Sequence, residues 1–455
     1  MKKPVLIFLT PVIISLGLTL ASNSANAQNY FFDVNGTTSG SGVANGGSYS
    51  WDGVNWDTNS AGTGPTLFSW PAGQFARFNG GVSGNSYTVT VNNDESMAGL
   101  FESVNGVNLT INSAGSGTLD ILQLGPNINN ITNVQGFLNG GSSSTMTINA
   151  VISGTGGLDP QNGGTINLFG NNTYSGPTVL TSSSTLVGFN NNNSFGTSTI
   201  FVNLASGFAP LISSGGSTIT LANTFSVAQS GGGVNFGSGA NTPVVSTGNW
   251  HLGVNNLNLR NNGNSTAPLT LSGVIDGSGG VTYSGANGGT IHLKNANTYT
   301  GTTTVGVSGA TSITLELDVA NAIAGSTKMV LAGGTLNPGG FNQQFGTLGL
   351  TASSTIDFGL GGDVLNFANS STTSWGAGDI LNLINWNSTL DSVFFGTDAT
   401  GLTSTQLAEI EFNGSGLGTA GLNSGGELIQ VPEPSTIALG ALGGLGLFFL
   451  RRRKA

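Results

Sequence analysis

Short stretches in which apolar and polar residues alternate recur along most of the chain. In SYTVTVN (residues 86–92), Tyr87, Val89 and Val91 share one side and the threonines between them share the other. Because successive side chains of a strand point to opposite faces, such a stretch predicts a strand of about four to seven residues with one buried face. The same pattern occurs in VNLTINS (107–113), STMTINAVI (144–152), GTINLFG (164–170), STITLAN (217–223), LTLSGVI (269–275), GTIHLKN (289–295) and SITLELD (312–318).

Clusters of glycine and asparagine separate these predicted strands at intervals of about 8–12 residues, which is typical of an all-β chain. Glycine and asparagine tolerate the positive φ angles that tight turns require. Helical periodicity is approached only in STQLAEIEF (404–412). We therefore expect an all-β fold.

One long unit occurs twice, at residues 146–180 and 269–305. Each copy reads as strand, Gly-Gly turn, strand, NTY-x-G turn and strand. A single copy cannot bury its own apolar face, whereas stacked copies bury a continuous core and pair their backbone edges, so the unit predicts a β-solenoid. The coinciding positions to which we assign a structural role are Gly156, Gly157, Gly163, Gly164, Tyr174 and Gly176 in the first copy and Gly279, Gly280, Gly288, Gly289, Tyr299 and Gly301 in the second.

The length of the chain sets an expected number of coils. At about 20–25 residues per coil, some 400 residues predict roughly 16–20 coils. Strands of neighbouring coils lie ~4.8 Å apart, which gives a rod of about 80–95 Å.

The N-terminal segment has the layout of a secretory signal peptide. Lys2 and Lys3 precede an apolar run at residues 4–21, and small residues follow it. The A-x-A-like sequence at residues 25–27 predicts cleavage between Ala27 and Gln28. The alternative is an N-terminal anchor that is not cleaved.

The C-terminal segment combines an apolar run with basic residues. Residues 436–450 carry no charge, and as a helix they would extend about 22 Å, less than the ~30 Å hydrocarbon core of a bilayer. Arg451, Arg452, Arg453 and Lys454 follow, and by the positive-inside rule they stay in the cytoplasm. This predicts membrane insertion through a C-terminal helix, transient or permanent, with the body of the protein across the membrane.

The same segment resembles a PEP-CTERM sorting signal, because Pro432, Glu433 and Pro434 directly precede the apolar run and the basic cluster. The resemblance implies transient arrest in the membrane after Sec-dependent export, and then processing by an exosortase-type enzyme. It also implies a Gram-negative bacterium, often one that makes exopolysaccharide. A permanent single-span anchor is the alternative.

The repeated unit resembles the autotransporter-associated β-strand repeat, whose GG…L…G.NTYSG.T.V run lies at residues 156–179 and 279–305. Residues 30–81 and 394–414 are similar to the flanking parts of such exported repeat proteins. The resemblance implies a right-handed parallel β-helix displayed outside the cell. Autotransporters end in a membrane barrel, whereas this chain carries the sorting-type tail, so another export route is expected.

Charged residues are rare in the body of the chain. Between residues 28 and 431 the basic residues are Arg77, Arg260, Lys294 and Lys328, whereas every acidic residue of the chain except Glu433 lies there. Such an acidic body cannot form the basic groove that binds nucleic acid. Exopolysaccharide remains a partner to consider, although an acidic polysaccharide would be repelled.

Metal and cofactor sites are not predicted from the sequence. The chain has no cysteine, so neither disulfides nor Cys-based metal sites can form. Its two histidines, His251 and His292, are too far apart for a His-x-x-His pair, and we interpret them as ordinary strand or turn residues. We expect no cofactor.

The remaining polar and aromatic clusters leave alternatives open. Carboxylates share a strand face at Glu316 and Asp318 and again at Glu409 and Glu411, and Asp276 is expected in a turn. We interpret them as solvated edges, and calcium binding or acid–base catalysis in a polysaccharide-cleaving β-helix is the alternative. The three N-terminal tryptophans predict either a cap or a carbohydrate contact, and the asparagines at 190–193 predict an Asn ladder or a mobile loop.

These observations predict an exported, non-enzymatic β-helical protein of the cell surface, outer membrane or extracellular matrix. A carbohydrate-binding adhesin is the first alternative, and a polysaccharide lyase or hydrolase is the second. The predicted segments are the signal peptide (1–27), an N-terminal cap with the first coils (28–140), a solenoid with the repeats (141–390), a C-terminal cap or linker (391–430) and the sorting signal (431–455).

Overall fold

The computed structural model describes residues 27–431 except for residues 116, 122–136, 140, 239–241, 264–265, 286–287 and 310–312. The predicted signal peptide therefore lies outside the described residues, apart from Ala27 at its cleavage site. The Pro-Glu-Pro motif at 432–434, the apolar span at 436–450 and the basic cluster at 451–454 also lie outside them.

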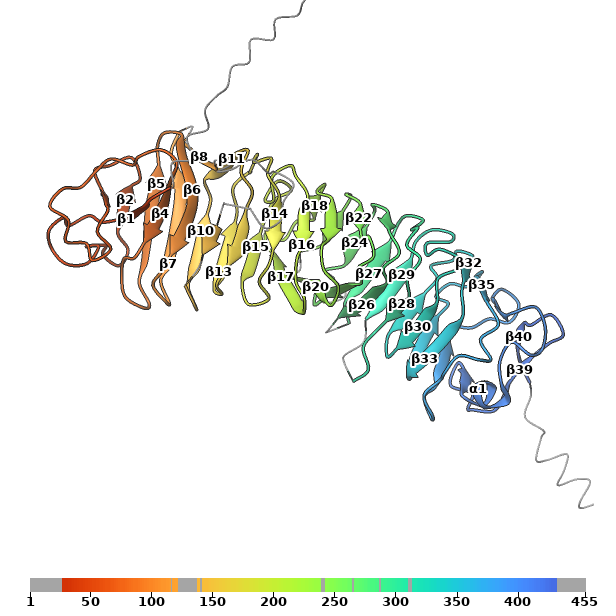
Figure 1. Cartoon of the computed structure of the whole chain (residues 1–455). Coiled ribbons are helices and arrows are strands. Elements are labelled where there is room, and N and C mark those ends of the chain that lie inside the picture. Colours follow the sequence, from red (N-terminus) through yellow and green to blue (C-terminus); the bar gives the residue numbers. More distant parts are fainter. Residues whose placement is uncertain are drawn as a thin grey trace, which may run out of the picture.

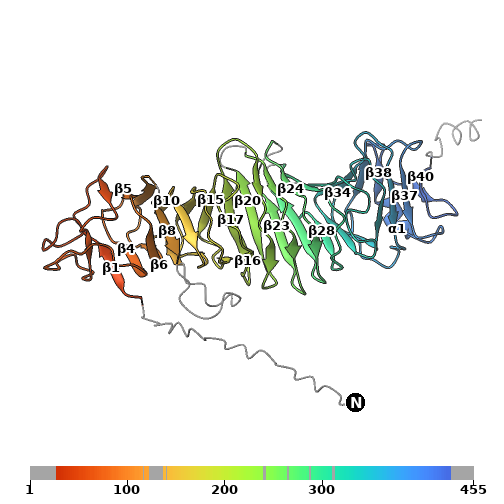
Figure 2. The ribbon, with the colours of Figure 1, turned by 90° about the horizontal axis from the view of Figure 1, so that it is seen from above.

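The described chain is a parallel β-solenoid of about 12 turns with almost no helix. Figures 1 and 2 show an elongated stack of coils that follows the order of the sequence from one end to the other. Within the described ranges the longest sheet has 13 strands, which add to the sheet in chain order. They are β2 (Ser48–Ser50), β5 (Ser86–Val91), β7 (Asn108–Ser113), β10 (Thr145–Ile148), β13 (Thr165–Leu168), β15 (Leu186–Phe189), β17 (Gly207–Ser213), β20 (Gly232–Ser238), β23 (Leu257–Asn261), β26 (Val281–Gly285), β28 (Thr303–Val305), β30 (Met329–Ala332) and β33 (Leu348–Ala352).

A second long sheet covers another side of the C-terminal half and also grows in chain order. It contains β18 (Ile219–Leu221), β21 (Val244–Ser246), β24 (Leu269–Leu271), β27 (Thr290–Leu293), β29 (Thr314–Leu317), β31 (Thr335–Asn337), β34 (Ser354–Asp357), β36 (Leu381–Ile384) and β38 (Ile410–Phe412). Shorter sheets complete the coils. One has β14 (Thr178–Leu180), β16 (Ile200–Val202), β19 (Phe225–Val227), β22 (Trp250–His251) and β25 (Ile275–Asp276), and another has β32 (Gln343–Phe345), β35 (Val364–Phe367) and β37 (Ser392–Phe395).

The core follows from the alternation in the sequence. In β10, Met146 and Ile148 are fully buried, whereas Thr145 and Thr147 are only partly buried. Met146 pairs in register with Leu109 of the preceding coil and with Ile166 of the following coil. Because the buried face of each strand pairs with the buried face of the strand in the next coil, apolar side chains form continuous columns inside the stack.

The predicted number of coils was too high, because coils near the N-terminus are longer than assumed. Tyr49 pairs with Val89 in the adjacent strand, and Ile111 pairs with Ile148. Each of these two coils therefore contains about 40 residues. The strands described within this extra chain belong to a sheet on the side of the first coils. It comprises β1 (Asn29–Phe32), β3 (Trp56–Asp57), β4 (Gln74–Phe78), β6 (Glu95–Glu102), β8 (Thr118–Ile121), β9 (Phe137–Asn139), β11 (Val151–Gly154) and β12 (Asp159–Gln161).

The N-terminal end of the stack contains a packed aromatic cluster. Trp51 and Trp56 are fully buried and Trp70 is almost so. The rings of Trp51 and Trp56 lie 5.0 Å apart, and those of Trp56 and Trp70 lie 4.5 Å apart. Buried rings cannot stack on a sugar, and these three tryptophans are part of the hydrophobic core.

The C-terminal end has a short helix and an antiparallel hairpin. The segment expected to be helical at 404–412 divides into α1 (Ser404–Ala408) and strand β38, because Thr403 and Gln406 form a capping box but the helix ends after one turn. The hairpin consists of β39 (Ala420–Leu422) and β40 (Leu428–Gln430). Across the residues described here, no helix is both long enough and apolar enough to span a bilayer.

Candidate functional site

The glycines of the repeated unit lie where neighbouring coils touch. A Cβ on Gly176 would overlap the backbone of Gly156 and Gly157, and a Cβ on Gly301 would overlap the backbone of Gly279 and Gly280. The two copies therefore make the same close approach between coils. It needs glycine because backbone atoms cannot move aside.

The Gly-Gly turns of the two copies are less alike than their sequences. Gly163 and Gly164 both have positive φ angles (88° and 68°), whereas in the second copy Gly288 has one (72°) and Gly289 does not. A Cβ on Gly289 would lie 2.6 Å from the carbonyl oxygen of Asn261 in the preceding coil. The second turn thus requires glycine partly for space and partly for conformation.

The tyrosine of each NTY-x-G turn points into the core. The Tyr174 hydroxyl lies 2.6 Å from Thr178 Oγ1, and Tyr299 makes the same 2.6 Å contact with Thr303. Burial raises the pKa of Tyr174 well above its ordinary value and that of Tyr299 to about 12, so both are neutral hydrogen-bonding groups. These contacts are internal and leave no atom for a ligand.

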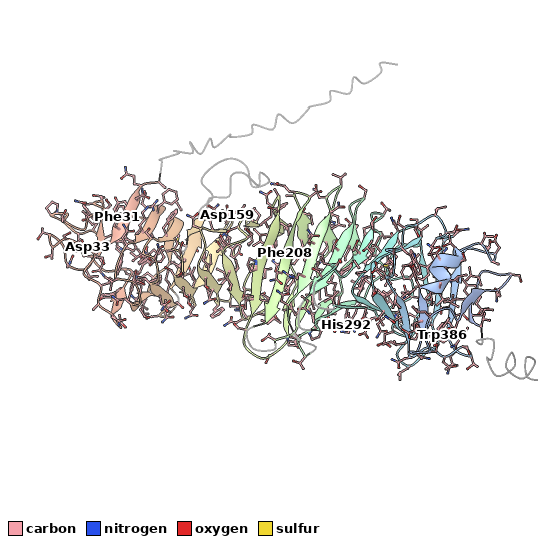
Figure 3. All side chains as sticks on the ribbon, turned by 90° about the horizontal axis from the view of Figure 1, so that it is seen from below. Phe31, Asp33, Asp159, Phe208, His292 and Trp386 are labelled. Carbon is pink, nitrogen blue, oxygen red and sulfur yellow. The ribbon has the colours of Figure 1, made fainter. Side chains whose placement is uncertain are left out.

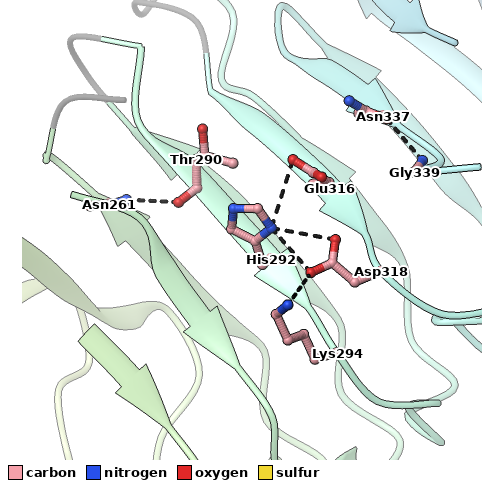
Figure 4. A network of polar contacts seen from close by, with 8 residues as sticks. All are labelled: Asn261, Thr290, His292, Lys294, Glu316, Asp318, Asn337 and Gly339. Carbon is pink, nitrogen blue, oxygen red and sulfur yellow. Dashed lines mark hydrogen bonds and ion pairs between the residues drawn. The ribbon is translucent and has the colours of Figure 1, made fainter. Parts of the chain in front are cut away.

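A network of ionisable side chains lies on the outer face of β27 and β29, as Figure 4 shows. The two strands are parallel and place His292 opposite Glu316, with the fully buried Leu293 and Leu317 as the next pair. Because side chains alternate, the following residues, Lys294 and Asp318, return to the outer face.

The distances in this network are short. His292 Nδ1 lies 3.2 Å from Asp318 Oδ2, 3.4 Å from Asp318 Oδ1 and 3.7 Å from Glu316 Oε2. Lys294 Nζ lies 3.0 Å from Asp318 Oδ2. The side chains of His292, Glu316 and Asp318 are 21%, 31% and 16% exposed, so the group is half-buried and open to solvent. In Figure 3, His292 lies between Phe208 and Trp386 along the stack.

The other histidine makes a simpler contact. His251 Nδ1 lies 2.9 Å from both carboxylate oxygens of Asp276, which ends β25 in the next coil and does not lie in a turn as expected. Of the residues that the structure describes, only His292, Glu316 and Asp318 form a group of three side chains able to share a metal ion. Neither pairing could be predicted from the sequence, because the partners lie 25 and 26 residues apart, about one coil.

The asparagine run at 190–193 contributes to a polar pocket of about 300 Å³. Asn193 Nδ2 donates to Asn171 Oδ1 of the preceding coil at 2.7 Å, which is one step of an Asn ladder. Asn192 Oδ1 accepts a hydrogen bond from the backbone of Thr220 in the following coil. The lining comprises Asn171, Asn190, Asn191, Asn192, Asn193, Gly215, Ser217, Thr218 and Ile219, all uncharged.

Buried carboxyl groups occur in the N-terminal coils as well. Burial raises the pKa of Glu102 to about 8, although its Oε1 accepts a hydrogen bond from the Val104 backbone at 2.6 Å. Glu102 is 1% exposed and lies at the end of β6. It has no access to a substrate, so it bears on stability and not on catalysis.

The comparisons with known proteins agree with the sorting tail and with the solenoid. Residues 430–454 match the PEP-CTERM protein-sorting motif. A segment of 214 residues is 30% identical to the adhesin BmaC autotransporter of Brucella suis biovar 1 (strain 1330). That segment is 46% of this chain but 6% of the adhesin, so the chain spans a small part of that relative's length. No solved structure matches.

Fold and motif together define an exported β-solenoid protein. The resemblance to PEP-CTERM proteins and to autotransporter-type repeats is confirmed. The motif implies an exported cell-surface protein of a Gram-negative bacterium and an exosortase-type processing enzyme as its partner.

Proposed function

We propose that this chain is a non-enzymatic structural protein of the cell surface or extracellular matrix. The observation that carries the proposal is the uninterrupted column of buried residues that links one coil to the next along the described stack. A solenoid of this kind holds its shape by contacts between neighbouring coils, without disulfides. The asparagines shared by the two copies of the repeat, Asn172 and Asn297, are used for these contacts.

The sorting tail supports an anchoring step before release. In this proposal the chain is exported through the Sec machinery, held in the membrane by residues 436–450 and processed near Pro434. The mature protein then begins at Gln28. The small number of charged residues in its body suits a rod that lies within neutral extracellular polymer.

Cell fractionation with intact-mass measurement tests this proposal. The wild-type chain is expected outside the inner membrane, with a mass that corresponds to residues 28 to about 434. A variant with Pro432→Ala and Pro434→Ala is expected to stay in the inner membrane with its tail. The control Ser424→Ala, an exposed hairpin residue, should be processed like the wild type. A wild-type chain that keeps Arg451–Lys454 in the inner membrane would instead mean a fixed anchor.

A carbohydrate-binding adhesin is the second candidate. The name of the Brucella relative and the uncharged, Asn-lined pocket favour it. Amide side chains can donate to and accept from sugar hydroxyls. Glycan-array binding that is lost in Asn192→Ala and kept in Asn258→Ala, which changes a partly exposed asparagine elsewhere, would favour the adhesin. Turnover of a polysaccharide, with or without calcium, would instead support an enzyme.

A further inference from the structure

We propose that His292, Glu316 and Asp318 form a binding site for a divalent transition-metal ion of the zinc type. The three side chains come from β27 and from β29 with the residue just after it. The parallel register brings them together on the outer face of two neighbouring coils. Neither the fold nor the sorting motif requires this combination.

The spacing of the ligand atoms fits tetrahedral coordination. Zinc lies about 2.0–2.2 Å from imidazole nitrogen and carboxylate oxygen, so ligand atoms around it are roughly 3.3–3.6 Å apart. His292 Nδ1 lies 3.4 Å from Asp318 Oδ1 and 3.7 Å from Glu316 Oε2. The ligand atoms of the three residues all lie within 4.8 Å of one another, so small rotamer changes complete the site.

The types of ligand favour a transition metal over calcium or magnesium. Imidazole suits zinc, copper and nickel, whereas calcium and magnesium take oxygen ligands almost exclusively. Two carboxylates neutralise the charge of the ion, and three protein ligands leave a fourth position for water or for a group from another molecule. The half-buried position limits competing hydration without closing access.

Lys294 orients the site without blocking it. Its Nζ contacts Asp318 Oδ2 at 3.0 Å, which leaves Asp318 Oδ1 free to coordinate the ion. Hydrogen-bonded partners of this kind fix the orientation of ligating carboxylates.

A purely structural ion-pair ladder is the alternative explanation. Half-exposed pairs of this type contribute about 0–1 kcal/mol, which gives little structural reason for three ligating groups and a lysine at one place. In the first copy of the repeat, the position that aligns with His292 is Asn167, which donates to Thr147 Oγ1 of the preceding coil. The coil is therefore built without ionisable groups at this position.

Isothermal titration of the full chain with zinc chloride at pH 7.5 tests the site. The protein is purified in non-ionic detergent without a histidine tag and is stripped of metal by chelation. We expect saturable binding of one zinc ion per chain and no binding of calcium at the same concentration. Because the chain has two histidines, zinc should shift the imidazole NMR signals of His292 and leave those of His251 in place.

Matched variants decide between site and ladder. His292→Ala and the shape-preserving Asp318→Asn are each expected to weaken zinc binding at least about tenfold. His251→Ala removes the comparable contact with Asp276, the one carboxylate that pairs with His251 among the described residues, and should leave the zinc affinity unchanged. Absence of saturable zinc binding, an unchanged affinity in His292→Ala, or an equal loss in His251→Ala would overturn the proposal.

Discussion

Asn297 joins three successive coils, and its replacement by alanine is the most direct test of how this solenoid is held together. Its Oδ1 accepts a hydrogen bond from the backbone of Ile275 in the preceding coil at 2.7 Å. Its Nδ2 donates to the carbonyl of Ala322 in the following coil at 2.8 Å. Asn172 makes the same two types of bond in the first copy of the repeat, at 2.8 and 2.7 Å.

The two bonds differ in what their loss costs. The buried N–H of Ile275 has Asn297 as its acceptor, so Asn297→Ala leaves it unpaired, at a cost of about 1–3 kcal/mol. The carbonyl of Ala322 still accepts from the Asn297 backbone at 3.0 Å, so the second loss is nearer 1 kcal/mol. The sum is about 2–4 kcal/mol, which corresponds to roughly 30- to 700-fold in a local opening equilibrium.

Hydrogen exchange followed by mass spectrometry measures this effect locally. In a solenoid each coil contacts its neighbours, so exchange should accelerate in peptides from residues 269–300 and much less in those from 345–395. The control Asn258→Ala removes an exposed bond to the Gly231 carbonyl and should change exchange little. Less than about threefold acceleration at 269–300, or the same acceleration in the control, would show that Asn297 does not link the coils as argued.

Three further changes test other parts of the packing. Gly301→Ala should lower the free energy of unfolding by about 3 kcal/mol, because the added Cβ overlaps the backbone of Gly279. In the control Gly349→Ala the added Cβ would meet its nearest atoms at 3.7 Å, so the urea midpoint should stay unchanged. Equal urea midpoints for the two variants would contradict the close approach at Gly301. Tyr299→Phe should cost about 1–3 kcal/mol in the same assay, because a buried threonine hydroxyl loses its partner, and a neutral result would mean that this hydroxyl finds another. The pKa of Glu102 is about 8 in the folded state and near 4.5 in the unfolded state, so the folded state binds the extra proton and the free energy of unfolding falls as the pH rises between these values. Glu102→Gln should flatten this part of the stability profile. An unchanged slope would refute the raised pKa of Glu102.

The alternation in the sequence was sufficient to place most of the predicted strands. Residues 86–92 become β5 and residues 164–170 become β13, with bounds that differ by one or two residues. The prediction worked because one face of each strand is buried, which imposes a period of two. The stretches at 144–152 and 269–275 each hold two strands, because the chain turns a corner of the coil within the alternating run.

The lengths of the coils and the composition of the outer face could not be predicted in the same way. A coil closes wherever its next strand finds a partner, so the long connection between Ile111 and Ile148 leaves no periodic signal. The contact of His292 with Asp318 depends on the register of β27 against β29, and that register is set by buried leucines rather than by the ionisable residues themselves. The segment at 404–412 was expected to be helical from its periodicity, and only Ser404–Ala408 is helical, where the capping box of Thr403 and Gln406 starts the helix.

The two copies of the repeat separate the residues that build the solenoid from those that distinguish its coils. Positions that coincide, such as Asn172 with Asn297 and Tyr174 with Tyr299, point inward or link neighbouring coils. Similarity at such positions, including similarity to a distant adhesin, reports on how the chain stacks and carries little information about a ligand. Individual properties must lie at outward positions where the copies differ, and the exchange of Asn167 for His292 is one of these. The zinc titration of His292→Ala therefore asks whether a coil of an otherwise regular rod has acquired chemistry of its own.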